Sequence, residues 1–273
     1  MKIIKTIKQL QAYRKELSGS IGFVPTMGAL HEGHLSLITQ ARAKNETLIV
    51  SIFVNPTQFL AHEDLSTYPR KDEADIEICK RAGVDALFMP DVTTMYQNDE
   101  AMMMAPKVRG YILEGHIRPG HFDGVLSVVL KLFNLVQPTN AYFGKKDAQQ
   151  LLLLKVMVKD YFLPLNIIEC ETIREKSGLA LSSRNVYLSA QEKNEALKIS
   201  KALHHVVTLI KEGTIEVKVL QQEMKKILSP LHIEYAVITN RQLKTISQIE
   251  MGNSIILIAV RLGSTRLIDN IWV

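Results

Sequence analysis

The chain of 273 residues is 47% hydrophobic and carries a formal net charge of +5 at pH 7. This length is enough to bury a large core and fits two domains of unequal size. No apolar run approaches the ~18 residues of a membrane span, and the first residues lack the pattern of a secretion signal. The two cysteines stand far apart and give no disulfide framework. We therefore predict a cytoplasmic protein without a membrane partner. Because its basic residues are dispersed, we do not expect it to bind nucleic acid.

Apolar, β-branched segments alternate with helical patterns in the first part of the chain. The predicted strands are 21–24, 47–54, 86–89, 141–143 and 165–170, and the predicted helices are 34–44, 72–82, 125–136 and 148–160. Alternation of this kind is typical of a parallel sheet, and strands that are apolar at successive positions indicate helices on both faces. We predict a doubly wound, Rossmann-like α/β domain over residues 1–172. Ligands of such domains bind beyond the carboxyl ends of the strands.

The segment Gly22–Ile38, GFVPTMGALHEGHLSLI, predicts a strand, a tight turn and a helix that begins near His34. A helix N-terminus attracts anions, and His31 and His34 can add donors for a polyphosphate. Gly28 is expected to take a positive φ, and Gly33 to let the backbone approach a ligand. The pair is also compatible with ordinary turn residues or with a metal pair, although no further ligand stands at convincing spacing. The sequences of a P-loop and of a G-x-G-x-x-G turn are absent.

The second predicted strand is followed by NPTQF, in which Asn55 and Gln58 stand at its carboxyl end. Amide side chains there suit hydroxyl and carboxylate groups of a substrate, and equally suit the backbone of a turn. The polar segment 60–74, LAHEDLSTYPRKDEA, is interpreted as a flexible lid.

Two further segments precede the third predicted helix. We expect the run of methionines 102–104 to pack. In EGHIRPGHFDG, residues 114–124, we interpret His116 and His121 as structural residues that hydrogen-bond to backbone.

The turn GKKDAQQ, residues 144–150, predicts a second site for phosphate and substrate. Gly144 frees the backbone, Asp147 can cap the following helix, and a lysine can neutralise charge that develops on a phosphoryl group. We assign that role to Lys146 and interpret Lys145 as a solvated surface residue.

The pattern changes after about Glu171. The loop GLALSSRN, residues 178–185, carries Arg184, whose guanidinium can grip phosphate. Helices at 191–212 and 217–228 and strands at 233–239, 255–260 and 265–271 follow, and Ser189 with Glu192 forms a capping-box pattern. We predict a smaller α+β domain over residues 173–273 that closes over the nucleotide.

These motifs resemble those of the pantothenate synthetase (pantoate–β-alanine ligase) family, within the nucleotidyltransferases that carry an H-x-G-H motif. The matching segments stand in the family's order between residues 21 and 188, and they are PTMGALHEGHLSLI, SIFVNPTQF, YPR, RPGHFDGV, YFGKKDAQQ and GLALSSRNVYLS. The resemblance implies an ATP-dependent ligase that forms pantoyl adenylate and pyrophosphate from ATP and (R)-pantoate. The amine of β-alanine then attacks the adenylate, and pantothenate and AMP are released. It also implies Mg²⁺ carried by the phosphates and a homodimer.

The resemblance also assigns roles to residues. His34, His31 and Lys146 are implied as catalytic residues, with His34 as the acid or transition-state donor. Gln58 and Gln150 are implied to bind pantoate, and Gln58 also β-alanine. The implied ATP site comprises Met27, Gly28, Ala29, Leu30, His31, Glu32, Gly33, His34, Gly144, Lys145, Lys146, Asp147, Ile173, Leu181, Ser182, Ser183 and Arg184.

The chain departs from the family pattern at two places. Lys145 replaces a usual acidic residue, and Leu60-Ala61-His62 replaces a usual Gly-Pro-Asn. The alternatives to this function are another adenylyltransferase of the same fold and a nucleotide-binding sensor without catalysis. Gln58 and Gln150, in place of a basic site for a phosphorylated acceptor, disfavour the first, and the intact histidine pair with Lys146 and Arg184 disfavours the second.

Overall fold

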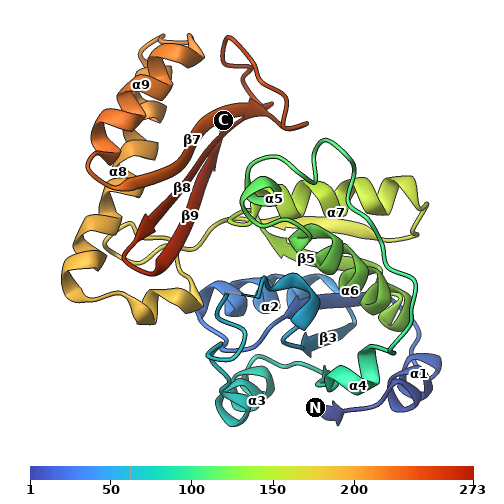
Figure 1. The fold of residues 1–273 in the computed structure, drawn as a ribbon. Coiled ribbons are helices and arrows are strands. Elements are labelled where there is room, and N and C mark those ends of the chain that lie inside the picture. Colours follow the sequence, from blue (N-terminus) through green and yellow to red (C-terminus); the bar gives the residue numbers. More distant parts are fainter. Residues whose placement is uncertain (62) are drawn as a thin grey trace. The chain divides into compact units, whose positions relative to one another are not determined.

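The computed structural model describes residues 1–61 and 63–273. Figure 1 follows the chain through two compact units, each built from two segments. Unit 1 comprises Met1–Gly144 and Leu153–Cys170, and unit 2 comprises Lys145–Leu152 and Glu171–Val273. The turn that carries Lys145 and Lys146 therefore packs with unit 2. In the described part of the chain, no helix combines the length and the apolar character that crossing a bilayer requires.

Unit 1 contains a six-stranded parallel sheet of order β1-β4-β3-β2-β5-β6. Its elements, in chain order, are β1 (Lys2–Ile4), α1 (Ile7–Lys15), β2 (Ile21–Thr26), α2 (Glu32–Lys44), β3 (Thr47–Ile52), η1 (Pro56–Gln58), α3 (Asp72–Arg81), β4 (Ala86–Phe88), α4 (Val92–Met95), α5 (Glu114–Ile117), α6 (His121–Val136), β5 (Asn140–Gly144), α7 (Ala148–Asp160) and β6 (Asn166–Cys170). Helix α7 begins in unit 2 and continues into unit 1. The strand order reverses between β2 and β5, which is where doubly wound sheets bind ligands.

Both faces of this sheet are covered. Val24 of β2 joins a buried cluster with Ile38 of α2 and Cys79 of α3. Its neighbour Phe23 points to the opposite face, where its ring meets Phe133 of α6 edge-on at a centroid distance of 6.4 Å. Successive side chains of a strand alternate between faces, so a strand buried on both sides is apolar at every position. The predicted doubly wound architecture is confirmed.

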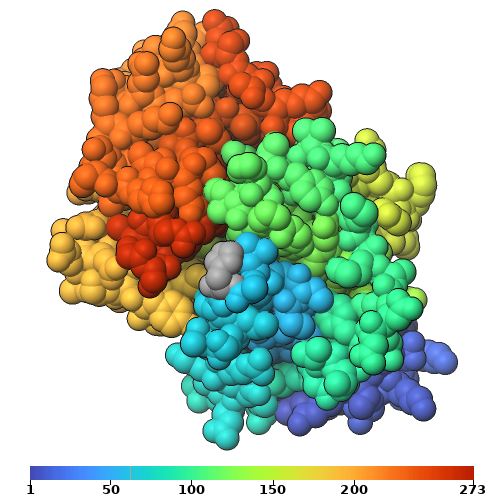
Figure 2. All heavy atoms as spheres, in the orientation of Figure 1, coloured from blue at the N-terminus to red at the C-terminus, as the bar shows by residue number. Residues whose placement is uncertain are grey.

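Unit 2 is a two-layer α+β structure. Its elements are η2 (Ser183–Tyr187), α8 (Ala190–Lys211), α9 (Val217–Leu228), β7 (His232–Asn240), β8 (Ser254–Leu262) and β9 (Thr265–Trp272), the strands forming an antiparallel sheet of order β7-β8-β9. Leu203 of α8, Leu220 of α9 and Ile258 of β8 share one buried core. The opposite side of the α8–α9 segment, orange in Figure 2, faces solvent. Ser189 and Glu192 form the expected capping box at the start of α8.

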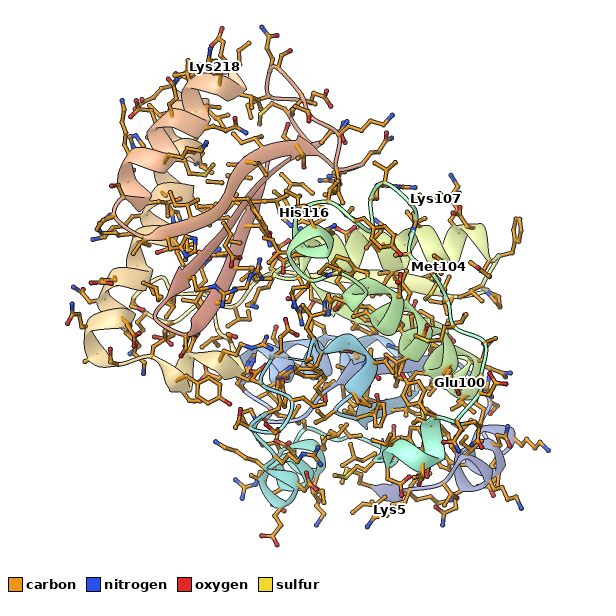
Figure 3. The ribbon with its side chains drawn as sticks, viewed as in Figure 1. Lys5, Glu100, Met104, Lys107, His116 and Lys218 are labelled. Carbon is orange, nitrogen blue, oxygen red and sulfur yellow. The ribbon has the colours of Figure 1, made fainter. Side chains whose placement is uncertain are left out.

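Most differences between the predicted and the observed elements concern the ends of helices and strands, or helices and strands that are short. Helix α6 begins at His121 rather than at residue 125, because the polar residues of its first turn hide the periodic signal. Strand β1, helices α4 and α5, and the 3-10 helices are too short to show a period. The methionine segment does not pack as expected, since Met104 is 73% exposed and projects from its loop (Figure 3).

Candidate active site

The two histidines of the first motif cap helix α2. Nδ1 of His31 accepts a hydrogen bond of 3.1 Å from the backbone N–H of Gly33, and Nδ1 of His34 accepts one of 3.3 Å from the backbone N–H of His31. The helix therefore begins at Glu32, two residues before the predicted start, with His31 as its N-cap. Because each Nδ1 acts as an acceptor, the proton of each neutral ring lies on Nε2. The rings lie 4.1 Å apart between centroids.

The turn before this helix is left-handed at two successive residues. Gly28 has a φ of 82°, as predicted, and Ala29 has a φ of 51°. A side chain in that region costs free energy, so surrounding contacts must hold it there. The carboxylate of Asp75, on α3, accepts hydrogen bonds of 2.8 Å from the backbone N–H groups of Ala29 and Leu30. Asp75 is buried, and burial raises its pKa. Asp75 is not among the residues predicted for the site, because its only signal in the sequence is a carboxyl on the buried side of a helix.

The segments after β2 and β3 meet, as the sheet topology predicts. The two strands are parallel neighbours whose last residues, Thr26 and Ile52, lie opposite each other. The side-chain amide of Gln58 donates to the sulfur of Met27 at 3.0 Å, and its oxygen accepts from Asn55 at 3.1 Å. Asn55 is fully buried and receives a hydrogen bond of 2.6 Å from Tyr96. The structure therefore brings Gln58, Asn55 and the Met27 loop together within unit 1.

His121 fixes the backbone of Gln58. Its Nδ1–H donates to the carbonyl of Gln58 at 2.7 Å, and its Nε2 accepts from Arg118 at 2.9 Å. Burial and the neighbouring Arg118 cation lower the pKa of His121 to about 4, so the ring is neutral near pH 7. Its interpretation as a structural histidine is supported. Arg118 in turn pairs with Glu63 at 2.5 Å. Although burial acts to raise the pKa of Glu63, its bonds with Arg118 hold that pKa below its usual value.

His116 takes no part in this network. It is an exposed side chain on α5 (Figure 3). The predicted lid begins beside the network, but His62, one of its residues and part of the departure at 60–62, lies outside the described residues.

Apart from Gly144, the second predicted turn belongs to unit 2. Nζ of Lys146 lies 3.8 Å from Oδ1 of Asp147, and the Lys146 side chain is 21% exposed. The interpretation of Lys145 as a solvated surface residue is wrong, because its ammonium pairs with Glu171 and lies 5.7 Å from the centroid of the Trp272 ring. Gln150 follows in the first turn of α7 and is half-buried, while its neighbour Gln149 is buried. The positive charge of Lys145 is thus matched by an acidic partner.

The third predicted segment is a short hairpin of the same unit. The backbone N–H of Leu181 donates to the carbonyl of Ile173 at 3.0 Å, so two residues of the implied ATP site are neighbours. The hydroxyl of Ser182 accepts from the backbone N–H of Arg184 at 3.3 Å and caps η2, which begins at Ser183. The geometry of the predicted site residues is therefore defined within each unit. Their convergence on one nucleotide remains a prediction.

Together these features are typical of a nucleotide-binding protein of the doubly wound α/β class. Turns suited to bind anions and neutral amide side chains follow its strands. Comparison with known proteins is more specific. Residues 2–272 match the sequence model of the pantoate-beta-alanine ligase family. The chain is 56% identical over 272 residues to the pantothenate synthetase of Aliarcobacter butzleri (strain RM4018) and 49% identical over 276 residues to that of Helicobacter pylori (strain P12), in each case covering 100% of both chains.

Solved structures agree with this assignment. The crystal structure of pantothenate synthetase from Thermus thermophilus is 40% identical and superposes with a TM-score of 0.95 over 99% of each chain. The pantoate-beta-alanine ligase from Francisella tularensis, solved with beta-gamma ATP and beta-alanine, is 39% identical with a TM-score of 0.82, over 100% of this chain and 97% of that one. The chain belongs to the pantoate–β-alanine ligase family. The resemblance seen in the motifs is confirmed and extends through unit 2, including residues after 188 whose likeness the motifs did not reveal.

Proposed function

We propose that this protein carries out the reaction of its family, the ATP-dependent ligation of pantoate to β-alanine, in two steps. The carboxylate of (R)-pantoate attacks the α-phosphorus of ATP, which gives pantoyl adenylate and releases pyrophosphate. The amine of β-alanine then attacks the acyl carbon, AMP leaves, and the amine loses a proton as pantothenate forms. Such chemistry needs positioning and charge stabilisation more than covalent help from the protein. The reaction thus belongs to the biosynthesis of pantothenate and of coenzyme A.

One contact supports the proposed binding site of pantoate. Gln58 contacts the sulfur of Met27 at 3.0 Å, so an amide suited to an organic acid stands directly beside the turn assigned to the nucleotide. Pantoate bound beside Gln58 would have its carboxylate next to the phosphates of ATP. The same amide is assigned to β-alanine, which must reach the same acyl carbon.

In unit 1, the segment from Met27 to His34 is assigned to ATP. The start of α2 carries partial positive charge, and the Nε2–H donors of His31 and His34 extend the set of groups for phosphate. His34 is assigned as the acid or transition-state donor. Support comes from the capping bonds at Nδ1, which define the donor nitrogen of each ring.

In unit 2, Lys146 is assigned to the phosphates, Asp147 to the ribose and Gln150 to pantoate. Gly144 of unit 1 is assigned to the same nucleotide site. Lys145 and Ile173 of unit 2 complete that site, and the segment from Leu181 to Arg184 closes on the phosphates from the domain formed by residues 173–273. The shared hairpin of Ile173 and Leu181 supports their assignment to one ligand.

Mg²⁺ is assigned to the phosphates of ATP rather than to a protein cage. Among residues 1–61 and 63–273, no three His, Cys, Asp or Glu side chains are grouped so as to hold a metal ion. Phosphate oxygens are hard ligands that Mg²⁺ prefers, and the ion would neutralise their charge. A homodimer, as the family resemblance implies, is part of the proposal, and sedimentation of the purified protein tests it. The cytoplasmic location predicted from the sequence is also part of the proposal.

The second candidate, another adenylyltransferase of the same fold, is not favoured, because relatives matching the whole chain are pantothenate synthetases. The decisive assay adds pantoate and β-alanine to ATP separately and together. We expect pantoate alone to release about one pyrophosphate per site, and AMP to accumulate only with both substrates. AMP formation that is independent of pantoate would refute the proposed function.

A further inference from the structure

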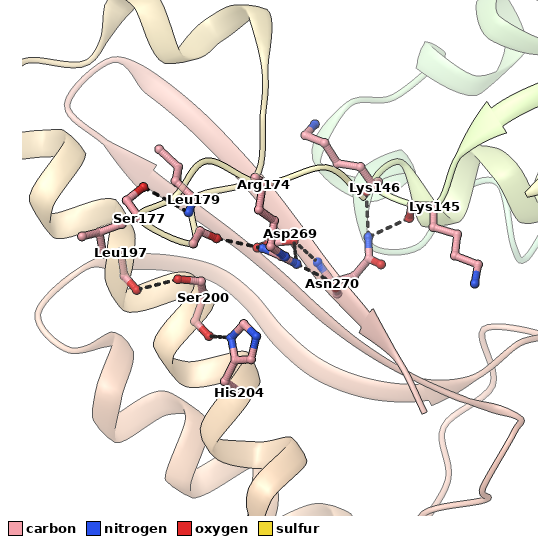
Figure 4. Close-up of polar contacts among 12 residues, drawn as sticks. Lys145, Lys146, Arg174, Ser177, Leu179, Leu197, Ser200, His204, Asp269 and Asn270 are labelled. Atoms are coloured by element: carbon pink, nitrogen blue, oxygen red, sulfur yellow. Dashed lines mark hydrogen bonds and ion pairs between the residues drawn. The ribbon is translucent and has the colours of Figure 1, made fainter. Parts of the chain in front are cut away.

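Asn270, a buried residue of β9, holds the turn that carries Lys146. The side chain of Asn270 is 4% exposed, and its Nδ2 donates to the carbonyls of Lys145 at 3.0 Å and of Lys146 at 2.7 Å. Its Oδ1 accepts from Nε1 of Trp272 at 2.9 Å. Figure 4 shows Asn270 between the turn and the rest of the network. Both amide protons and the amide oxygen of this side chain are thus used.

The neighbouring residue extends the network to the hairpin of the implied nucleotide site. Asp269 is also buried, and it accepts hydrogen bonds from Arg174 at 2.5 and 2.8 Å. Arg174 donates further to the carbonyls of Gly178 at 3.2 Å and of Asn270 at 3.3 Å. One strand of unit 2 therefore anchors two loops: the turn Lys145–Asp147 and the hairpin that leads to Ser182 and Arg184.

The two hydrogen bonds from Asn270 to the carbonyls of Lys145 and Lys146 define the shape of the turn. Successive carbonyls of an extended chain point in opposite directions, so one amide can reach both only where the backbone is folded. In this arrangement the side chains of Lys145 and Lys146 leave the turn in different directions (Figure 4). Lys145 is held by Glu171, and Lys146 extends toward Asp147. A buried donor with no acceptor is costly, which makes the folded turn and Asn270 mutually dependent.

We propose that Asn270 is a positioning residue that holds the backbone of Lys146 so that its ammonium reaches the phosphates during adenylation. This inference rests on the proposed role of Lys146. Asn270 touches no reacting atom and acts through the lysine. A displacement of about 1 Å in a charge-stabilising group is enough to lower turnover on the order of 10²-fold.

The test is a double-mutant cycle on the full chain, with pantoate-dependent pyrophosphate release as the measured rate. Asn270→Ala removes both donors, and Asn270→Asp replaces them by an oxygen that faces two carbonyl oxygens. We expect each change to lower kcat by about 10- to 100-fold while the KM for pantoate changes less than about twofold. In a Lys146→Ala background, Asn270→Ala should lower kcat by less than about threefold, because the group through which it acts is already absent.

The matched control is Asn194→Asp, the same chemical change at an exposed position of α8. It should leave kcat within about twofold. Trp272 is the only tryptophan of the chain and bonds to Asn270, so its fluorescence reports directly on the network. Asn270→Ala should shift its emission and Asn194→Asp should not. If Asn270→Ala does not fold, Asn270→Ser, which keeps one shorter donor, takes its place in the cycle.

The outcomes separate the two claims. Equal losses from the Asn270 change in both backgrounds, or no loss in folded protein, would overturn the positioning role. An unchanged rate in Lys146→Ala alone would instead overturn the assignment of Lys146 in the proposed function, whatever the Asn270 variants do.

Discussion

Asp75 lies 46 positions after Ala29 in the chain, yet its carboxylate accepts the backbone N–H of Ala29 at 2.8 Å. The second carboxylate oxygen accepts the N–H of Leu30 at the same distance. A helix that carries none of the motif residues thus holds the turn that leads into the histidine pair. The left-handed φ of Ala29 persists because this carboxylate satisfies both amides.

Asp75→Asn should impair use of ATP. The amide oxygen still accepts one N–H, but the NH₂ group faces the other, which leaves a buried donor unsatisfied at about 1–3 kcal/mol. We expect the KM for ATP to rise about tenfold or more in steady-state assays, with little change in the KM for β-alanine. Glu73→Gln, on the exposed side of the same helix, is the matched control. Equal KM values for ATP in the two variants would contradict this role of Asp75.

His121 should make stability depend on pH in a defined window. Its pKa is lowered from 6.5 to about 4 in the folded protein, chiefly by burial. Between these values the unfolded chain takes up the proton and the folded protein does not, so the free energy of unfolding falls as the pH decreases from 6.5 toward 4. The loss attributable to this residue is about 3 kcal/mol, at about 1.4 kcal/mol per pKa unit. Urea unfolding at a series of pH values measures it.

His121→Asn supplies the comparison, because its amide can still donate to the carbonyl of Gln58 but does not titrate. The variant should be less stable at pH 7 and show a shallower decline as the pH falls from 6.5 to about 4. Parallel stability curves for the two proteins would show that His121 does not remain neutral in the fold.

Gly124→Ala should damage the site of Gln58 from the side of α6. A Cβ at this position would lie 2.3 Å from the carbonyl oxygen of Thr57 and 2.8 Å from the backbone nitrogen of Gln58. Neither atom belongs to a movable side chain, so the backbone must shift, at a cost of about 1–3 kcal/mol. We expect a lower midpoint of urea unfolding together with a higher KM for pantoate. A variant with unchanged values would show that the two segments separate easily.

His34 and Lys146 should each matter for turnover. Substitution of either by Ala is expected to lower the rate of pyrophosphate release at least ~10²-fold, as for removal of a preorganised donor. His34→Asn offers a finer test, because its oxygen can accept the N–H of His31 and preserve the cap, while the Nε2–H is lost. It should be as slow as His34→Ala and more stable in thermal unfolding. Recovery of the rate in His34→Asn would limit His34 to a capping role.

The sequence predicted most of the sheet of unit 1, because its longer strands are continuous apolar runs and its longer helices show a helical pattern of apolar residues. It also located Met27, His31, His34 and Gln58 at the ends of neighbouring strands. It did not predict the residues that hold the backbone of the turn at Ala29 and Leu30 and of the turn at Lys145 and Lys146. Asp75 and Asn270 are single polar residues within regular elements, and only the folded chain shows which backbone groups they meet. The interpretation of Lys145 failed for the same reason, because its acidic partner, Glu171, is remote in sequence.

The reciprocal hydrogen bonds of His31 and His34 have a thermodynamic consequence. Both imidazole rings lose their rotational freedom when the chain folds rather than when a ligand arrives. An anion that meets the start of α2 therefore encounters donors with fixed torsion angles, and more of its interaction energy is available for affinity. The conformational entropy of the two rings is lost when the chain folds, so it is not lost again when an anion binds.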